Sequence, residues 1–127
     1  MQSRPTFEQV RDAVMAHVRA RGWDEENTGR GLAISISLEA SELLEYFQWQ
    51  EENVGDTEDL ASELADIIIY TVQFADKYGI DILPEVLKKL DKTAKKYPVE
   101  IFDIKDKEER NRVWREAKLS YEKDTTL

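Results

Sequence analysis

Two apolar stretches of this sequence carry carboxylates at a spacing of three residues. That spacing keeps side chains on one side of an α-helix, about one turn apart. Ionised carboxylates are costly to bury unless a cation pairs with them, so acids on an apolar helix predict a bound cation. Oxygen ligands favour Mg²⁺, with Mn²⁺ as the second candidate. The acids, within the stretches Leu38–Trp49 and Leu60–Tyr70, are Glu39, Glu42, Glu45, Glu63 and Asp66.

The two acid-bearing segments are expected to lie side by side. The turn between them is short enough to make two helices pack antiparallel. This packing would bring Glu39 and Glu42 towards Glu63 and Asp66. Four crowded carboxylates repel one another and take up protons unless a divalent cation compensates their charge. We therefore interpret these four residues as metal ligands.

Glu45 continues the series but is rotated further round its helix. It is a candidate for a further ligand, for a group that orients a ligand, or for a base that deprotonates water. Helical glutamates commonly form solvated faces, but Glu63 and Asp66 lie among apolar residues that leave little exposed surface. A di-iron carboxylate bundle needs Glu-x-x-His pairs. The only histidine, His17, belongs to no such pair, and we expect it at an exposed or core-edge position.

Composition limits the class of protein. The 127 residues suffice for one domain. With 41% hydrophobic and 35% charged residues, the chain can form a core and still dissolve. The absence of cysteine excludes disulfides, zinc fingers and thiol catalysis. A net charge of −9 disfavours nucleic acid as a partner. Residues 1–5 lack an apolar signal-peptide core and no run has membrane-spanning length, so we expect a cytoplasmic protein without a membrane partner.

The chain is expected to be all-α, with short connections between its helices. Thr6 and Gln9 predict a capping box at the first helix. Leu32–Leu38 alternates apolar and small residues as a strand would, but no helix breaker separates it from the helical run that follows, so we predict helix. The expected segments are a helix from Phe7 to about Ala20, a polar connection Trp23–Gly31, a helix to about Phe47, a turn Glu51–Asp56, a helix from about Glu58 to Lys77, a helix between Asp81 and Pro98, an irregular segment Val99–Asp106, and a helix from Lys107 to about Glu122.

Aromatic and basic residues beside these segments are candidates for substrate binding. Trp23 and Trp49 adjoin polar turns, where they could stack on a nucleobase or pack as ordinary core or interface aromatics. A solvated charged face accounts for most of the lysines before Pro98, and one or two of them could reach a phosphate. The candidates are Trp23, Asn27, Arg30, Trp49, Lys89, Thr93, Lys96 and Tyr97.

The combined motifs resemble a known family. Glu39–Glu42 and Glu63–Asp66 are similar to the E-x-x-E and E-x-x-D signature of the MazG-like superfamily of all-α nucleotide pyrophosphohydrolases. Gly22–Asp24, Glu45–Trp49 and Lys95–Pro98 resemble its dCTP pyrophosphatase branch. The resemblance covers about residues 5–98, and the segment 107–127 lies outside it.

The resemblance implies an all-α fold, a four-helix MazG-like bundle with an additional C-terminal helix. It implies a single domain over residues 1–127, with a core at about 5–98 and an extension at about 107–122. It also implies a homodimer or homotetramer. The implied activity is Mg²⁺-dependent hydrolysis of a (deoxy)nucleoside triphosphate to the monophosphate and pyrophosphate, as a house-cleaning enzyme for non-standard or surplus nucleotides.

The resemblance also assigns roles to individual residues. Glu39, Glu42, Glu63 and Asp66 match the family's metal ligands, and Trp23, Trp49, Lys89 and Tyr97 match positions that contact the nucleotide. The chain has Asn27 where the branch carries a histidine and Thr93 where it carries an asparagine, so no base is assigned. Two alternatives stay open, a hydrolase of the same fold that acts on another nucleotide such as dUTP, and a non-catalytic helical interaction protein.

Overall fold

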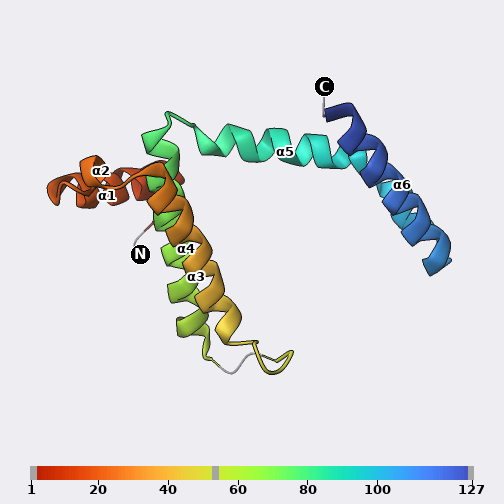
Figure 1. Ribbon diagram of the computed structural model, residues 1–127, viewed down its shortest axis with the longest axis horizontal. Helices are drawn as coiled ribbons and strands as arrows, with labels where there is room; N and C mark the ends of the chain where they lie inside the picture. Colours follow the sequence, from red (N-terminus) through yellow and green to blue (C-terminus); the bar gives the residue numbers. More distant parts are fainter. Residues whose placement is uncertain (1–2, 53–54, 126–127) are drawn as a thin grey trace. The chain divides into compact units, whose positions relative to one another are not determined.

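The computed structural model describes residues 3–52 and 55–125, with side chains up to Ser120, and this part of the chain contains helices and no strand. It confirms the all-α prediction. The chain divides into two compact units, residues 1–81 and 82–127. The single domain inferred for residues 1–127 stays a prediction. The helices, labelled in Figure 1, are α1 (Phe7–Ala20), α2 (Trp23–Glu26), α3 (Gly29–Glu45), α4 (Thr57–Lys77), α5 (Ile82–Lys96), the 3₁₀-helix η1 (Val99–Asp103) and α6 (Lys107–Thr125).

Helix α1 begins with the predicted capping box. The Gln9 amide donates to the Thr6 hydroxyl at 3.1 Å, and the Thr6 amide donates to Gln9 Oε1 at 2.8 Å. These bonds satisfy amide groups that a helix leaves unpaired at its first turn. Met15 and Val18 on α1 are buried against Val72 of α4 and form the centre of the core. An Arg19–Asp76 ion pair at 3.1 Å links the same two helices at the surface.

The predicted polar connection Trp23–Gly31 is wrong in two respects. Residues 23–26 form the short helix α2, and α3 begins at Gly29. Gly22 adopts a left-handed conformation (φ 69°), which glycine reaches without a steric cost and which lets the chain reverse between α1 and α2. The Thr28 hydroxyl accepts from the Gly31 amide at 3.0 Å and caps α3.

Helices α3 and α4 lie side by side and antiparallel, as Figure 1 shows. Leu32–Leu38 lies within α3, so the helical prediction for this segment is confirmed. The Asp56 carboxylate accepts from the Asp59 amide at 2.8 Å and caps α4. Of the predicted turn Glu51–Asp56, residues 53–54 lie outside the described residues. The antiparallel pair is what places the acids of the two helices opposite one another.

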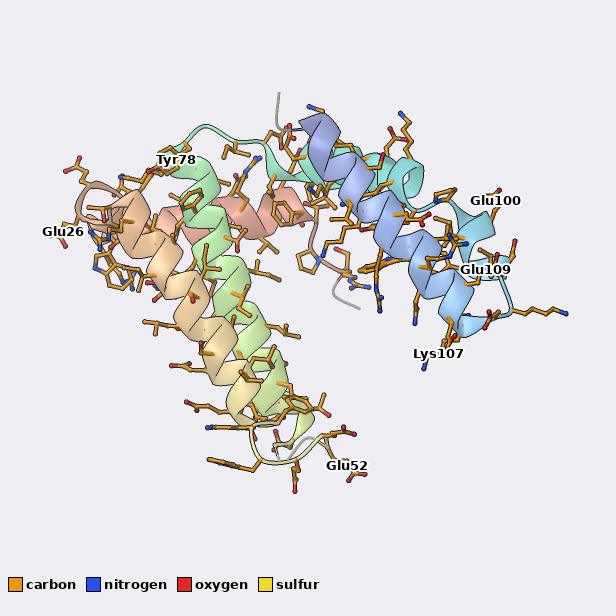
Figure 2. All side chains as sticks on the ribbon, turned by 45° about the vertical axis from the view of Figure 1, so that its right-hand side comes forward. Glu26, Glu52, Tyr78, Glu100, Lys107 and Glu109 are labelled. Atoms are coloured by element: carbon orange, nitrogen blue, oxygen red, sulfur yellow. The ribbon has the colours of Figure 1, made fainter. Side chains whose placement is uncertain are left out.

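The start of α3 is fixed against the end of α4. A Cβ atom at Gly29 would overlap the Tyr78 hydroxyl, so only glycine permits this approach. Figure 2 labels Tyr78 at the C-terminal end of α4. Gly79 follows with a φ of 64° and ends the helix. This contact brings the start of α3 close to the end of α4.

The second unit consists of α5, η1 and α6. The segment Val99–Asp106 was predicted to be irregular, but residues 99–103 form a 3₁₀-helix whose Ile101 is buried. The Tyr97 ring, just after α5, stacks on the Trp114 ring of α6 with centroids 5.5 Å apart and an interplanar angle of 11°. No helix in the described part of the chain combines the length and apolar character that a membrane span needs.

Candidate functional site

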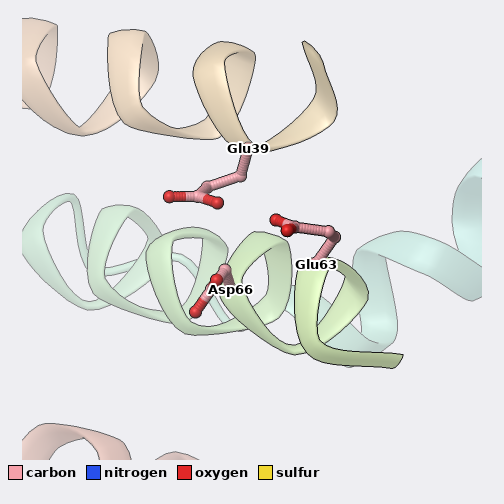
Figure 3. A group of neighbouring side chains, drawn as sticks. All are labelled: Glu39, Glu63 and Asp66. Carbon is pink, nitrogen blue, oxygen red and sulfur yellow. The ribbon is translucent and has the colours of Figure 1, made fainter. Parts of the chain in front are cut away.

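Three of the predicted metal ligands come together between α3 and α4. Glu39 of α3 and Glu63 and Asp66 of α4 each offer a carboxylate oxygen, and these oxygens lie within 4.8 Å of one another. Figure 3 shows the carboxylates of Glu39 and Glu63 turned towards each other across the helix pair. All three side chains are half-buried. Because α3 and α4 are antiparallel, acids 24 to 27 residues apart in sequence reach one point in space.

The cluster lacks compensating donors. Glu39 Oε2 and Glu63 Oε2 are both buried and accept no hydrogen bond from the described residues. Burial raises the pKa of Glu39 from 4.5 to about 7, and a hydrogen bond with Glu42 and the charges of Glu42, Asp66 and Glu63 act in the same direction. Burial also raises the pKa of Glu63, with Glu42 and Asp66 adding to it. The cluster offers several carboxylate oxygens and few hydrogen-bond donors. Mg²⁺ and Mn²⁺ prefer ligands of this kind.

Glu42 and Glu45 differ from the other acids. Glu42 is exposed and lies outside the group of three, but its side chain interacts with both Glu39 and Glu63. Its assignment as a ligand stays a prediction. Glu45 is the exposed last residue of α3, and its role also stays a prediction.

A cavity of about 710 Å³ lies beside the carboxylates, within the first unit. Asp66 belongs both to the cluster and to the cavity wall, so the two features are continuous. The wall mixes apolar and aromatic side chains with six polar or charged ones, a combination that can hold a small organic ligand and fix its orientation. The wall consists of Ala13, Val14, His17, Val18, Trp23, Glu26, Asn27, Gly31, Leu32, Ser35, Asp66, Ile69, Tyr70 and Gln73.

Trp23 and Asn27, two of the predicted substrate-binding residues, line this cavity. Trp23 is 43% exposed, and its ring meets the His17 ring edge to face with centroids 5.8 Å apart. Arg21 lies over the Trp23 ring at 5.6 Å. His17 is exposed, as predicted, but the cavity gives it a position for contacting a ligand that the sequence did not indicate.

Sequence reasoning also missed Tyr70 and Gln73. They follow Asp66 by four and seven residues, a spacing that places all three on one side of α4. Extending the acid pattern along the helix would have identified them.

Six predicted substrate-binding residues do not line the cavity. Trp49 is 88% exposed in the turn after α3, and Arg30 is exposed at the start of α3. Lys89, Thr93 and Lys96 on α5, and Tyr97 just after it, belong to the second unit. The roles of these six residues stay predictions.

Comparison with known proteins shows the family of this chain. A family model described as MazG-like matches residues 34–111, which include all five acids. Similar proteins include dCTP pyrophosphatase 1 of Bos taurus, 33% identical over 107 residues that cover 78% of this chain and 63% of the relative. Another is dCTP pyrophosphatase 1 of Homo sapiens, 29% identical over 105 residues that cover 76% and 62%. The chain thus spans somewhat less than two thirds of the length of these relatives.

A solved structure has a similar fold. The crystal structure of a pyrophosphatase from Archaeoglobus fulgidus matches with a TM-score of 0.64 and 29% identity. The match covers 77% of this chain and 97% of that protein. Over the matched 77% of this chain, the fold is similar to that of a known pyrophosphatase.

Proposed function

Because this chain belongs to the MazG-like family, we propose that it is a nucleoside triphosphate pyrophosphohydrolase that depends on a divalent cation. It converts a (deoxy)nucleoside triphosphate and water into the monophosphate and pyrophosphate. The names of the relatives in cattle and man make dCTP the first substrate to test. We further propose that the enzyme acts in the cytoplasm and removes surplus or non-standard nucleotides.

One observation carries the proposal. Asp66 is shared by a cluster of three carboxylates and by a cavity large enough for a nucleoside. A cation held by Glu39, Glu63 and Asp66 would lie beside the cavity in which Trp23 offers its ring to the base. The phosphate groups of the substrate would bind this cation. The protein has a net charge of −9 and repels anions, so a cation is needed to hold a triphosphate.

The cluster fits Mg²⁺ because two of its oxygens, Glu39 Oε2 and Glu63 Oε2, are buried and accept no hydrogen bond from the described residues. When bound, Mg²⁺ supplies charge compensation for the phosphates and for the oxygen that leaves. The protein's own part is to orient the substrate and the attacking water. Water attacks the α-phosphorus, the bond from that phosphorus to the α,β-bridging oxygen breaks, and Glu45 accepts the proton from the water. Lys89 and Lys96 stay proposed contacts for the phosphates, as the charge of their side chains suits.

Self-association is part of the proposal. Several large apolar side chains on α5 are exposed, among them Leu87 at 69% and Leu90 at 60%, and α5 has no buried residue. Contiguous apolar surface of this kind is costly in water. A second copy of the chain would cover it, in a homodimer or homotetramer.

Pyrophosphate release from a panel of (d)NTPs tests the proposal. The assay is run with Mg²⁺, with Mn²⁺ and with EDTA, on the wild type and on Glu63→Gln and Glu42→Gln. Release that needs the cation and is lost in the variants supports the proposal. Glu58→Gln, an exposed acid on the same helix, is the matched control and should keep full activity. A folded wild type that releases no pyrophosphate from any nucleotide would exclude this function and leave the acids with a structural role.

A further inference from the structure

Gln73 is a buried polar side chain in an apolar part of α4. It lies on α4, is 6% exposed, and its neighbours in sequence, Val72 and Phe74, are apolar. Its side chain lines the cavity beside the carboxylates. In a core position of this kind an apolar residue is the usual choice, because burying an amide costs free energy unless it is fully hydrogen-bonded.

The hydrogen bonding of Gln73 is incomplete. Gln73 Oε1 accepts from Asn27 Nδ2 at 3.2 Å, a bond that joins α4 to the segment between α2 and α3. Within the described residues this is the one side-chain hydrogen bond of Gln73. Its Nε2 group, which can donate twice, is therefore available at the cavity wall. Asn27 Oδ1 likewise remains available as an acceptor, so the pair presents one donor and one acceptor side by side.

We propose that Gln73 is a specificity-determining residue, which together with Asn27 hydrogen-bonds the polar edge of a nucleobase bound in the cavity. This inference rests on the proposed nucleotide hydrolysis and names the part of the site that selects the base. Gln73 Nε2 donates to a ring nitrogen or carbonyl oxygen of the base. Asn27 Oδ1 accepts from an exocyclic amino group beside it. Cytosine has that arrangement, whereas uracil and thymine have a carbonyl in place of the amino group.

The position of Gln73 along α4 suits this role. Gln73 follows Asp66 by seven residues, which is about two helical turns and a rise of roughly 10 Å. That rise is comparable to the length of a nucleoside. A nucleotide with its phosphates at the cation site next to Asp66 can therefore extend along α4 and place its base at Gln73. Trp23 and Tyr70 line the same cavity and offer ring faces for the base.

Such a pair can discriminate between bases because Gln73 is buried and Asn27 is half-buried, so both are partly shielded from water. When a bound base offers no matching group, a buried donor or acceptor stays unpaired, and the complex is weakened by the full cost of desolvation. A purely apolar wall would discriminate far less between bases of similar size.

The test compares base preference in the wild type and in Gln73→Leu, which keeps the approximate volume and removes both hydrogen-bonding groups. kcat/KM is measured for dCTP, dTTP, dUTP, dATP and dGTP with Mg²⁺. We expect the preference of the wild type for its best base to fall by about tenfold or more in Gln73→Leu. Gln50→Leu, an exposed glutamine outside the site, should leave the ranking and the ratios unchanged.

The ratio between bases separates a specificity role from a structural one. General damage to the fold lowers kcat/KM for all five nucleotides by the same factor and leaves their ratios intact. An unchanged ratio in folded Gln73→Leu would overturn the inference while leaving the hydrolase function in place. A wild type inactive on all nucleotides would overturn the hydrolase function and this inference with it. If Gln73→Leu does not fold, Asn27→Ala, at a half-buried position, carries the same test with the same expected loss of preference.

Discussion

The carboxylates of Glu39 and Glu63 face each other from adjacent helices, and each has a buried oxygen without a hydrogen-bond partner among the described residues (Figure 3). Two such groups cannot both be ionised at low cost unless a cation lies between them. We therefore expect the cluster to exchange protons for a divalent cation near neutral pH. This exchange links metal binding, pH and stability in one site, and the first two predictions follow from it.

Glu63→Gln is expected to reduce cation affinity and pyrophosphate release by at least a hundredfold. The variant keeps the shape of the side chain but loses a charged ligand. The metal-free variant should also be more stable than the metal-free wild type, because the repulsion between Glu63 and its acidic neighbours is gone. Isothermal titration with Mg²⁺ or Mn²⁺ and urea denaturation in EDTA measure the two effects. A metal-free variant less stable than the wild type would contradict the repulsion argument.

The stability of the metal-free protein should fall as pH rises from about 4.5 to about 7. Glu39 has a raised pKa of about 7 in the folded chain, against 4.5 when unperturbed. Between these values the unfolded chain releases a proton that the folded chain retains, so rising pH favours unfolding. Below 4.5 both states are protonated, and above about 7 both are ionised, so the loss is then complete. Urea titrations at pH 5 and pH 8 in EDTA measure it.

The pH effect has an internal control. Glu39→Gln cannot ionise, so the contribution of this position to the difference between pH 5 and pH 8 should disappear. Saturating Mg²⁺ should flatten the same difference in the wild type, because the cation holds the ionised form. A slope that persists unchanged in Glu39→Gln would assign the effect to other groups.

Trp23→Ala is expected to raise KM about tenfold or more while changing kcat little. The Trp23 ring lines the cavity and is 43% exposed, so it offers a face to a base and contributes little to the core. Stacking of a base on an aromatic ring contributes roughly 1–3 kcal/mol. Steady-state kinetics measure the split, and Trp23→Phe should retain most of the affinity. An equal fall in kcat for Trp23→Ala would instead indicate a role in the chemical step.

The sequence was sufficient to predict the helices whose ends carry local signals. Thr6 with Gln9 and Asp56 with Asp59 are capping boxes, which depend on residues three apart. The acid cluster was predictable for a related reason, since helical spacing and a short turn bring Glu39, Glu63 and Asp66 together. Helix α2 was missed because its four residues are too few for a periodic pattern.

The cavity was not predictable in the same way. Its wall combines His17 of α1 with Asn27 and Gln73, and these three meet only because α1 packs across α4. No local pattern connects residues separated by ten and by 46 positions. Trp49 lies outside this cavity and is 88% exposed, so its proposed contact with the nucleotide stays a prediction.

Trp114→Ala is expected to destabilise the second unit and to raise KM. The Trp114 ring stacks on Tyr97 at 5.5 Å, and Lys96 and Lys118 lie over the two rings at 5.1 and 5.5 Å. A stacked aromatic pair contributes about 0.5–1.5 kcal/mol beyond its buried area. Because Lys96 and Tyr97 are proposed to bind the nucleotide, loosening this stack should weaken substrate binding and leave kcat near its wild-type value.

Three measurements on the full chain check this prediction. Near-ultraviolet circular dichroism reports the Tyr97–Trp114 stack, urea denaturation reports stability, and kinetics report KM. Trp114→Phe should preserve all three, since a phenyl ring can still stack. Leu119→Ala, at an exposed position on the same helix, is the matched control. A loss of stability in Trp114→Ala with an unchanged KM would confine α6 to a structural role and would remove the support for Lys96 and Tyr97 as nucleotide contacts.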